Sequence, residues 1–175
     1  MNHMSEDLSD ATVRPFYADV NVLRGTDRTP GRLPSTGLIG LYFSAHWCPP
    51  CRAFTPQLAA FSAFAAAHSA DPANGCVPIE FVFVSSDHDE TSFEEYWATM
   101  GFPAVQYTPS GEEEACHRQL LASGYNIDGY PTLLIVEAAT GRIIDAKGRG
   151  TVQGGFRPND PDTGIKILQE WSAII

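Results

Sequence analysis

Two of the chain's four cysteines, Cys48 and Cys51, lie three positions apart in the stretch FSAHWCPPCRAF, residues 43–54. Two prolines separate them, and Trp47 comes directly before them. An apolar run of strand length, residues 37–45, precedes the pair, and apolar side chains recur every three or four positions after it. This pattern predicts a buried strand followed at once by a helix that begins at the cysteines.

The start of a helix is a place where a thiolate is favoured over a thiol. Cys48 would face unpaired backbone N–H groups and the positive end of the helix dipole, and motifs of this kind have thiol pKa values lowered to roughly 3.5–7.5. Cys51, one turn later, would lie on the same face and within reach. We therefore predict that Cys48 attacks a disulfide and that Cys51 resolves the mixed disulfide.

The residues around the pair fit this chemistry. Pro49 and Pro50 would occupy the first helical turn, where a missing N–H group costs nothing and a fixed φ stiffens the loop. Trp47 could shield the sulfur and offer a flat apolar contact to an incoming partner; an ordinary core tryptophan is the alternative interpretation.

A structural zinc site is the main competing hypothesis for a close cysteine pair, and it requires a second pair of comparable spacing. The remaining cysteines, Cys76 and Cys116, are isolated from each other, and His46 and His117 follow no zinc-binding spacing. Redox chemistry is therefore favoured over metal binding. Cys76 and Cys116 are interpreted as small apolar residues rather than redox sensors.

The composition is that of a globular protein, with 175 residues of which 43% are hydrophobic. A net charge of -10 and a pI near 4.7 argue against nucleic-acid or anionic-membrane partners. The first ten residues lack the pattern of a secretory signal, and no apolar run is long enough to span a membrane. We expect a cytoplasmic protein with a flexible tail at residues 1–12 and one domain at residues 13–175, and in that compartment a close cysteine pair is catalytic or metal-binding.

The rest of the chain alternates strand and helix patterns and then forms a hairpin, which predicts an α/β domain with a mixed central sheet. Thr91 with Glu94, or Ser92 with Glu95, would form a capping box for the second helix. The expected elements are a short strand within 16–25, turns at 25–36, a buried strand at 79–87, a helix ending near 101, a helix within 111–124, a hairpin of 131–138 and 142–148, a long turn at 154–164 and a final helix from 163.

Several motifs together resemble the thioredoxin superfamily: WCPPCR, Pro56 eight residues after Cys48, and GYPTLLI with Pro-Thr before a strand. LYFSAHWCPPCRAFTPQL, FVFVSSDHDETSFEEYWATM and YNIDGYPTLLIVEAATGRIIDAKGR are more specifically similar to tryparedoxin and nucleoredoxin. The resemblance covers roughly residues 20–165. It implies a thioredoxin fold in which Pro131 is cis and lies beside the cysteines, so that backbone groups of Tyr130 can pair with a substrate chain.

The chain departs from the family pattern at a few positions. Tyr42 stands where thioredoxins have a buried acid that accepts the proton of the resolving thiol; tryparedoxins also have tyrosine there, so water or a hydrogen-bonding side chain must take this role. Tyr130 replaces a small aliphatic residue, and MGFPAVQY replaces a segment with a Pro-Trp pair. His46 replaces a smaller polar residue and is interpreted as a solvated loop histidine, although assistance to the thiolate is the alternative.

The resemblance implies a thiol–disulfide oxidoreductase that passes electrons from a trypanothione-like dithiol to peroxiredoxins or glutathione-peroxidase-type enzymes. No flavin, nicotinamide or metal motif occurs, so we expect no bound cofactor and an external donor. A monomer is expected. The alternative is a nucleoredoxin-like binding module in which the cysteine pair switches partner binding with little turnover.

Overall fold

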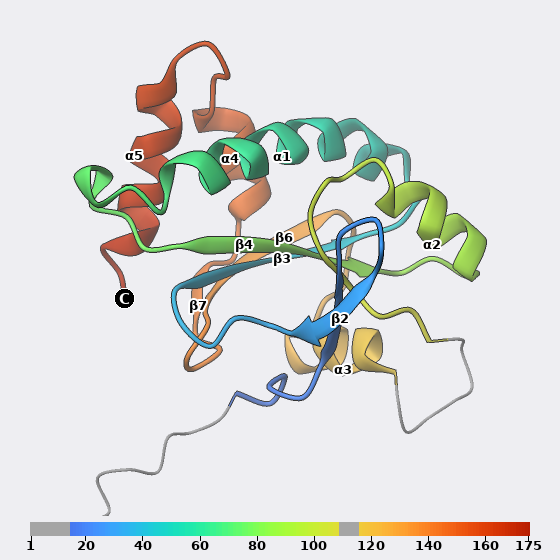
Figure 1. Cartoon of the computed structure of the whole chain (residues 1–175). Coiled ribbons are helices and arrows are strands. Elements are labelled where there is room, and N and C mark those ends of the chain that lie inside the picture. The colour runs from blue at the N-terminus through green and yellow to red at the C-terminus, as the bar shows by residue number, and fades with distance from the viewer. Residues whose placement is uncertain (1–14, 109–115) are drawn as a thin grey trace, which may run out of the picture.

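The structure is a computed structural model that describes residues 15–108 and 116–175 (Figure 1). The tail predicted at residues 1–12 therefore lies outside the described residues. Within them, seven strands form one sheet in the order β2-β1-β5-β4-β3-β6-β7. The strands are β1 Asn21–Arg24, β2 Thr29–Arg32, β3 Leu38–Ser44, β4 Ile79–Ser85, β5 Ala104–Val105, β6 Thr132–Glu137 and β7 Ile143–Asp145.

The strand that leads to the cysteine pair, β3, lies inside the sheet. It pairs in parallel with β4 and antiparallel with β6, so the sheet is mixed, as the strand and helix pattern predicts. All of its residues are buried, because both faces of the sheet are covered. Successive side chains alternate between two apolar clusters, with Tyr42 on one side and Leu41 and Phe43 on the other.

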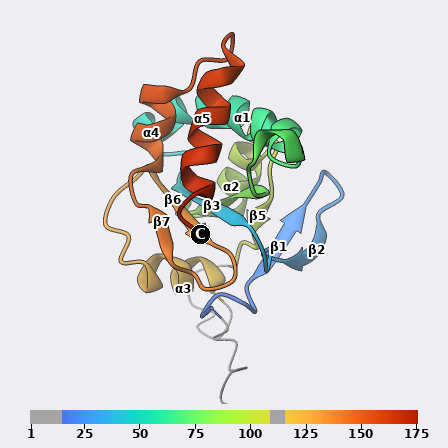
Figure 2. The same cartoon turned by 90° about the vertical axis from the view of Figure 1, so that its left-hand side faces the viewer.

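Helices cover both faces of the sheet (Figures 1 and 2). On one face lie α1, α4 and α5, whereas α3 lies on the other. This arrangement confirms the predicted thioredoxin-type α/β fold. The helices are α1 Pro49–His68, α2 Glu90–Trp97, α3 His117–Gly124, α4 Gly148–Gly155 and α5 Pro161–Ser172, with a short 3-10 turn η2 at Pro72–Asn74.

The long helix α1 is held by the stripe that the sequence predicts. Phe54, Leu58, Phe61 and Ala65 are all buried. Phe61 lies at the centre of this interface, with its ring centroid 5.8 Å from that of Trp171 in α5 and of Phe81 in β4. The helix continues through Pro56.

The two-residue strand β5 and the short turn η2 were not predicted, and neither were two larger elements. The first, β2, lies in the segment expected to contain only turns, and it pairs antiparallel with β1. The second, α4, covers residues expected to be the end of a strand and part of a long turn. Its sequence, GRGTVQGG, is rich in glycine, which argues against a helix on propensity alone. Tertiary packing favours the helix despite this low propensity. A Cβ at Gly148 would come within 2.9 Å of the Leu133 carbonyl oxygen, so the glycine permits α4 to approach β6 closely.

The start of α2 also differs from the prediction. Asp89 is the N-cap, and its side chain accepts a hydrogen bond of 2.7 Å from the Ser92 backbone N–H group. Thr91 and Ser92 lie inside the helix, so neither predicted capping box forms. An acidic side chain at the cap satisfies an exposed N–H group and also faces the positive helix end. The helix within 111–124 is described only from His117 onward.

Candidate active site

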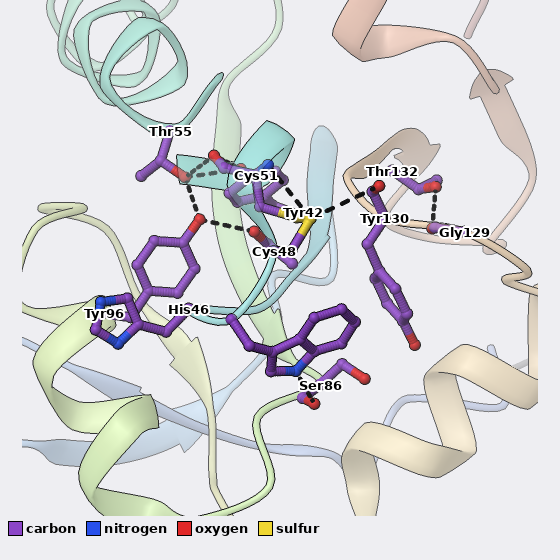
Figure 3. Close-up of a disulfide and its surroundings, with 12 residues drawn as sticks. Tyr42, His46, Cys48, Cys51, Thr55, Ser86, Tyr96, Gly129, Tyr130 and Thr132 are labelled. Carbon is purple, nitrogen blue, oxygen red and sulfur yellow. Dashed lines mark hydrogen bonds between the residues drawn. A yellow bond between two sulfur atoms is a disulfide. The ribbon is translucent and has the colours of Figure 1, made fainter. Parts of the chain in front are cut away.

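The two cysteines lie at the junction of β3 and α1. Cys48 is the N-cap of α1, and Pro49 and Pro50 occupy its first turn, as predicted. The Cα atoms of Cys48 and Cys51 are 5.2 Å apart and their sulfurs form a disulfide (Figure 3). Cys51 is fully buried, whereas Cys48 keeps 5% of its surface exposed. An external thiol or disulfide can therefore reach Cys48 and not Cys51.

The backbone around Cys48 is arranged to stabilise negative charge on its sulfur. The Cys51 N–H group donates to Cys48 Sγ at a distance of 3.4 Å. This N–H group belongs to the first turn of α1, where backbone donors have no partner within the helix and the dipole is positive. After reduction, the same donor would face a thiolate, and a hydrogen bond to the charged form favours that form.

The segment before β6 completes the other side of the disulfide. The peptide bond between Tyr130 and Pro131 is cis, as the resemblance implies. The carbonyl oxygen of Tyr130 lies 3.8 Å from Cys48 Sγ (Figure 3). The loop is fixed by Thr132, whose hydroxyl donates to the Gly129 carbonyl oxygen over 2.7 Å. Backbone groups at Tyr130 thus lie next to the sulfur that a substrate would approach.

Trp47 forms an exposed rim beside the disulfide and is not a core residue. Its side chain is 49% exposed. The indole Nε1–H donates to the Ser86 carbonyl oxygen at 3.1 Å, and the ring stacks on His88 at a centroid distance of 5.8 Å. Its edge meets the Tyr130 ring at 6.0 Å. The hydrogen bond fixes the indole in one orientation, which leaves its free face available to a partner.

Behind Cys51, buried hydroxyl groups take the place of a carboxylate. The Tyr42 hydroxyl hydrogen-bonds to Thr55 Oγ1 at 2.8 Å, and Thr55 Oγ1 donates to the Cys51 carbonyl oxygen at 2.9 Å. The Tyr96 hydroxyl joins the same network and also pairs with Ser44 Oγ at 2.8 Å. Burial raises the pKa of Tyr42, so its phenol stays protonated. Tyr42 is therefore a neutral hydrogen-bonding group.

Sequence reasoning identified Tyr42 but missed its partners. Thr55 lies four residues after Cys51 on α1, and this helical spacing is a signal that could have placed its hydroxyl at the Cys51 carbonyl group. Tyr96 lies on α2 with aromatic neighbours at helical spacing, a pattern that indicates a core residue. It is buried as expected, but its hydroxyl reaches the active-site helix.

Thr55→Val is expected to lower the free energy of unfolding by about 1–3 kcal/mol, because the Tyr42 and Tyr96 hydroxyls lose a buried partner. Urea denaturation of the oxidised protein measures this change. Thr55→Ser is the matched control: it keeps the hydroxyl and should retain most of the stability. A loss in Thr55→Val no larger than the loss in Thr55→Ser would contradict this prediction, because only the valine variant lacks the hydroxyl.

His46 and Asp87 organise the loop before Trp47. The His46 backbone N–H group donates to the Asp87 carboxylate at 2.7 Å, and the Ser85 hydroxyl donates to the same carboxylate at 2.7 Å. Asp87 is buried at the active-site end of β4. The His46 ring is half-buried and stacks on Tyr96 with centroids 5.4 Å apart. His46 therefore lies in a loop, as predicted, but it is only partly solvated because the Tyr96 ring covers one of its faces.

The other two cysteines lie apart from this site. Both Cys76 and Cys116 are half-buried free thiols. Burial raises the pKa of Cys76, which disfavours its reactive thiolate form. Across residues 15–108 and 116–175, no group of three or more His, Cys, Asp or Glu side chains is placed to hold a metal ion. In the same residues, no helix is long and apolar enough to cross a membrane.

Comparison with known proteins identifies relatives across most of the chain. Residues 37–143 match a family model described as thioredoxin-like. Nucleoredoxin from Danio rerio is 35% identical over 155 residues, covering 87% of this chain and 33% of that protein, so the chain spans about a third of its length. Tryparedoxin from Trypanosoma brucei brucei is 35% identical over 112 residues, covering 64% of this chain and 69% of that protein. The solved structure of tryparedoxin II from C. fasciculata superposes with a TM-score of 0.64 at 34% identity, covering 79% of this chain and 88% of that one.

Proposed function

Because the chain belongs to the thioredoxin-like family that includes nucleoredoxin and tryparedoxin, we propose that it is a protein-disulfide reductase of the tryparedoxin type. The observation that carries the proposal is the disulfide itself: Cys48, at the start of α1, keeps 5% of its surface exposed, whereas Cys51 is fully buried. This asymmetry separates an attacking cysteine from a resolving cysteine.

The cycle begins with the reduced protein. The Cys48 thiolate attacks one sulfur of a substrate disulfide, the substrate S–S bond breaks, and one substrate thiolate leaves. The Cys51 thiol then loses its proton and attacks Cys48 Sγ, which releases the second substrate thiolate and forms the Cys48–Cys51 disulfide. Two electrons pass to the substrate, whose thiolates take up two protons. An external dithiol reverses these steps and restores the reduced pair.

We further propose that the donor is a trypanothione-like dithiol and that peroxiredoxins or glutathione-peroxidase-type enzymes are acceptors. A structure of tryparedoxin II in complex with glutathionylspermidine, 34% identical to this chain, supports a small thiol of this class. The Tyr130 carbonyl group and the exposed face of Trp47 offer such a molecule a polar and an apolar contact beside Cys48. In this proposal the protein acts as a monomer.

The donor is tested by oxidising the protein and following tryptophan fluorescence while trypanothione, glutathione or a thioredoxin–reductase system is added. We expect trypanothione to reduce the disulfide fastest, and Trp47→Phe should remove most of the signal. Fast reduction by a different donor would contradict trypanothione as the donor but would still support the proposed disulfide-reductase activity. Slow reduction by all three would contradict the proposed turnover.

A nucleoredoxin-like binding module is the second candidate, favoured by the match to nucleoredoxin over most of this chain and by the large aromatic rim of Trp47 and Tyr130. In that case the redox state of the pair would control partner binding, so Cys51→Ala, which cannot form the Cys48–Cys51 disulfide, would fix the protein in one binding state.

A further inference from the structure

A small pocket lies beside the disulfide, between the end of β4 and α3. Its volume is about 190 Å³, and Ser86, His88, Arg118, Gln119 and Tyr130 are among the residues that line it. This is smaller than the ~300–1,000 Å³ of pockets that enclose whole ligands, so it would take one group of a ligand.

The pocket is within reach of a molecule that reacts at Cys48. Tyr130 lines the pocket, and its carbonyl oxygen is 3.8 Å from Cys48 Sγ. Ser86 lines the same pocket and holds the Trp47 indole through its carbonyl oxygen. In Figure 3, Ser86 and Tyr130 both lie on the Cys48 side of the disulfide, away from Thr55.

Arg118 places a positive charge in the wall of this pocket, and its side chain is not neutralised by a described residue. It is only 8% exposed. Its guanidinium donates to the Ser85 carbonyl oxygen at 2.8 Å and to the Thr108 carbonyl oxygen at 2.9 Å, and lies 4.0 Å from the centre of the Tyr107 ring. These partners are uncharged. Among residues 15–108 and 116–175, its buried Nε atom has no hydrogen-bond partner. A buried cation in this state favours an anion nearby.

The other titratable groups of the pocket leave room for an anion. His88, at the exposed rim, can add positive charge but no negative charge. Asp87 lines the pocket and is negative, but its carboxylate already accepts from the His46 N–H group and the Ser85 hydroxyl. Glu112, Glu113 and Glu114 lie outside the described residues.

We propose that this pocket binds a carboxylate of the substrate, such as an acidic side chain next to the reacting cysteine. Arginine is well suited to this group because its N–H donors match the two carboxylate oxygens. The proposal rests on the proposed function, since it names the chemistry that the same site would prefer in the molecule that reacts at Cys48.

The test compares two peptides that differ in one group, N-acetylated and C-amidated Gly-Cys-Glu and Gly-Cys-Gln. The rate at which each reduces the oxidised protein is measured at 0.15 M salt and corrected for the thiolate fraction of the peptide. We expect the glutamate peptide to react roughly fivefold faster. A tenfold rate ratio corresponds to about 1.4 kcal/mol, so the expected difference in activation free energy is smaller than this value.

Variants then locate the effect. Gln119 is exposed and lines the pocket, so Gln119→Glu should abolish the preference and Gln119→Lys should increase it, with the fold unchanged. Gln57→Glu on α1 is the matched control, because it makes the same charge change at an exposed position that does not line this pocket. It should keep the preference. Arg118→Gln should abolish the preference, but Arg118 also hydrogen-bonds to the end of β4 and to Thr108, so this variant can disturb the fold. The Gln119 variants are therefore the decisive test of the pocket.

Equal rates for the two peptides with the wild-type protein would overturn the proposal, as would equal effects of Gln119→Glu and Gln57→Glu. Concentrated thiols reduce accessible disulfides in general, so rates can be measured in every case. Equal and fast rates would contradict the carboxylate pocket alone. Equal and slow rates, together with slow reduction by trypanothione, would contradict both this pocket and the proposed function.

Discussion

Cys51→Ser is expected to stop turnover and trap the protein on its acceptor. Cys48 remains at the start of α1 and can still attack a substrate disulfide. The buried group that should attack Cys48 Sγ would then be a hydroxyl, which cannot displace the substrate thiolate. Disulfide-reductase activity should fall by at least about two orders of magnitude, as expected when one member of a catalytic unit is removed. Non-reducing gel electrophoresis should show a covalent complex with the acceptor, which a reducing agent releases.

Two further serine variants are the controls for this experiment. Cys48→Ser should give neither activity nor a covalent complex, because the attacking thiolate is missing. Cys116→Ser changes a half-buried free thiol outside the site and should behave like the wild type. Wild-type turnover by Cys51→Ser would show that Cys48 works alone and would contradict the assigned roles.

Phe61→Ala is expected to have the largest effect on stability. Phe61 is fully buried, and its ring contacts the rings of Phe64, Phe81, Phe156 and Trp171, which come from α1, β4, the segment after α4, and α5. Truncation leaves a cavity where these elements meet and should lower the free energy of unfolding by about 3–5 kcal/mol. Urea denaturation monitored by circular dichroism measures this change.

Leu120→Ala is the control for the core substitution. Leu120 lies on α3 and is 45% exposed, so its truncation should change stability by no more than about 0.5 kcal/mol. A loss below about 1 kcal/mol for Phe61→Ala would mean that the core can collapse around the missing ring. Such a result would contradict the central position assigned to Phe61.

The elements that carry the disulfide could be predicted because local and long-range signals agree there. The fully apolar run of β3 and the stripe from Phe54 to Ala65 each specify one element, and the cysteines mark their junction. By contrast, β2 contains proline and glycine, so its short sequence predicts a turn. It lies at the edge of the sheet and pairs with β1 alone. The helix α4 packs closely on β6 at Gly148, and no local rule indicates this contact.

The same limit applies to the candidate site. Cys48, Cys51 and the prolines could be placed from spacing alone, and Tyr130 and Pro131 from the family resemblance. Ser44, Tyr96 and Arg118 could not, because each acts through a partner that is distant in the sequence: Ser44 hydrogen-bonds to Tyr96 across 52 positions, and Arg118 to Ser85 across 33. Hydrogen bonds of this kind follow from the fold and have no local sequence signature.

The central claim is that electrons reach the acceptor through the Cys48–Cys51 pair. The most direct measurement quenches the reaction during turnover, alkylates free thiols and determines by mass spectrometry how many alkyl groups the peptide containing both cysteines carries. We expect none with excess acceptor and two with excess trypanothione, while Cys76 and Cys116 stay unchanged and serve as internal references. A pair whose state does not follow the donor and acceptor during turnover would contradict this account.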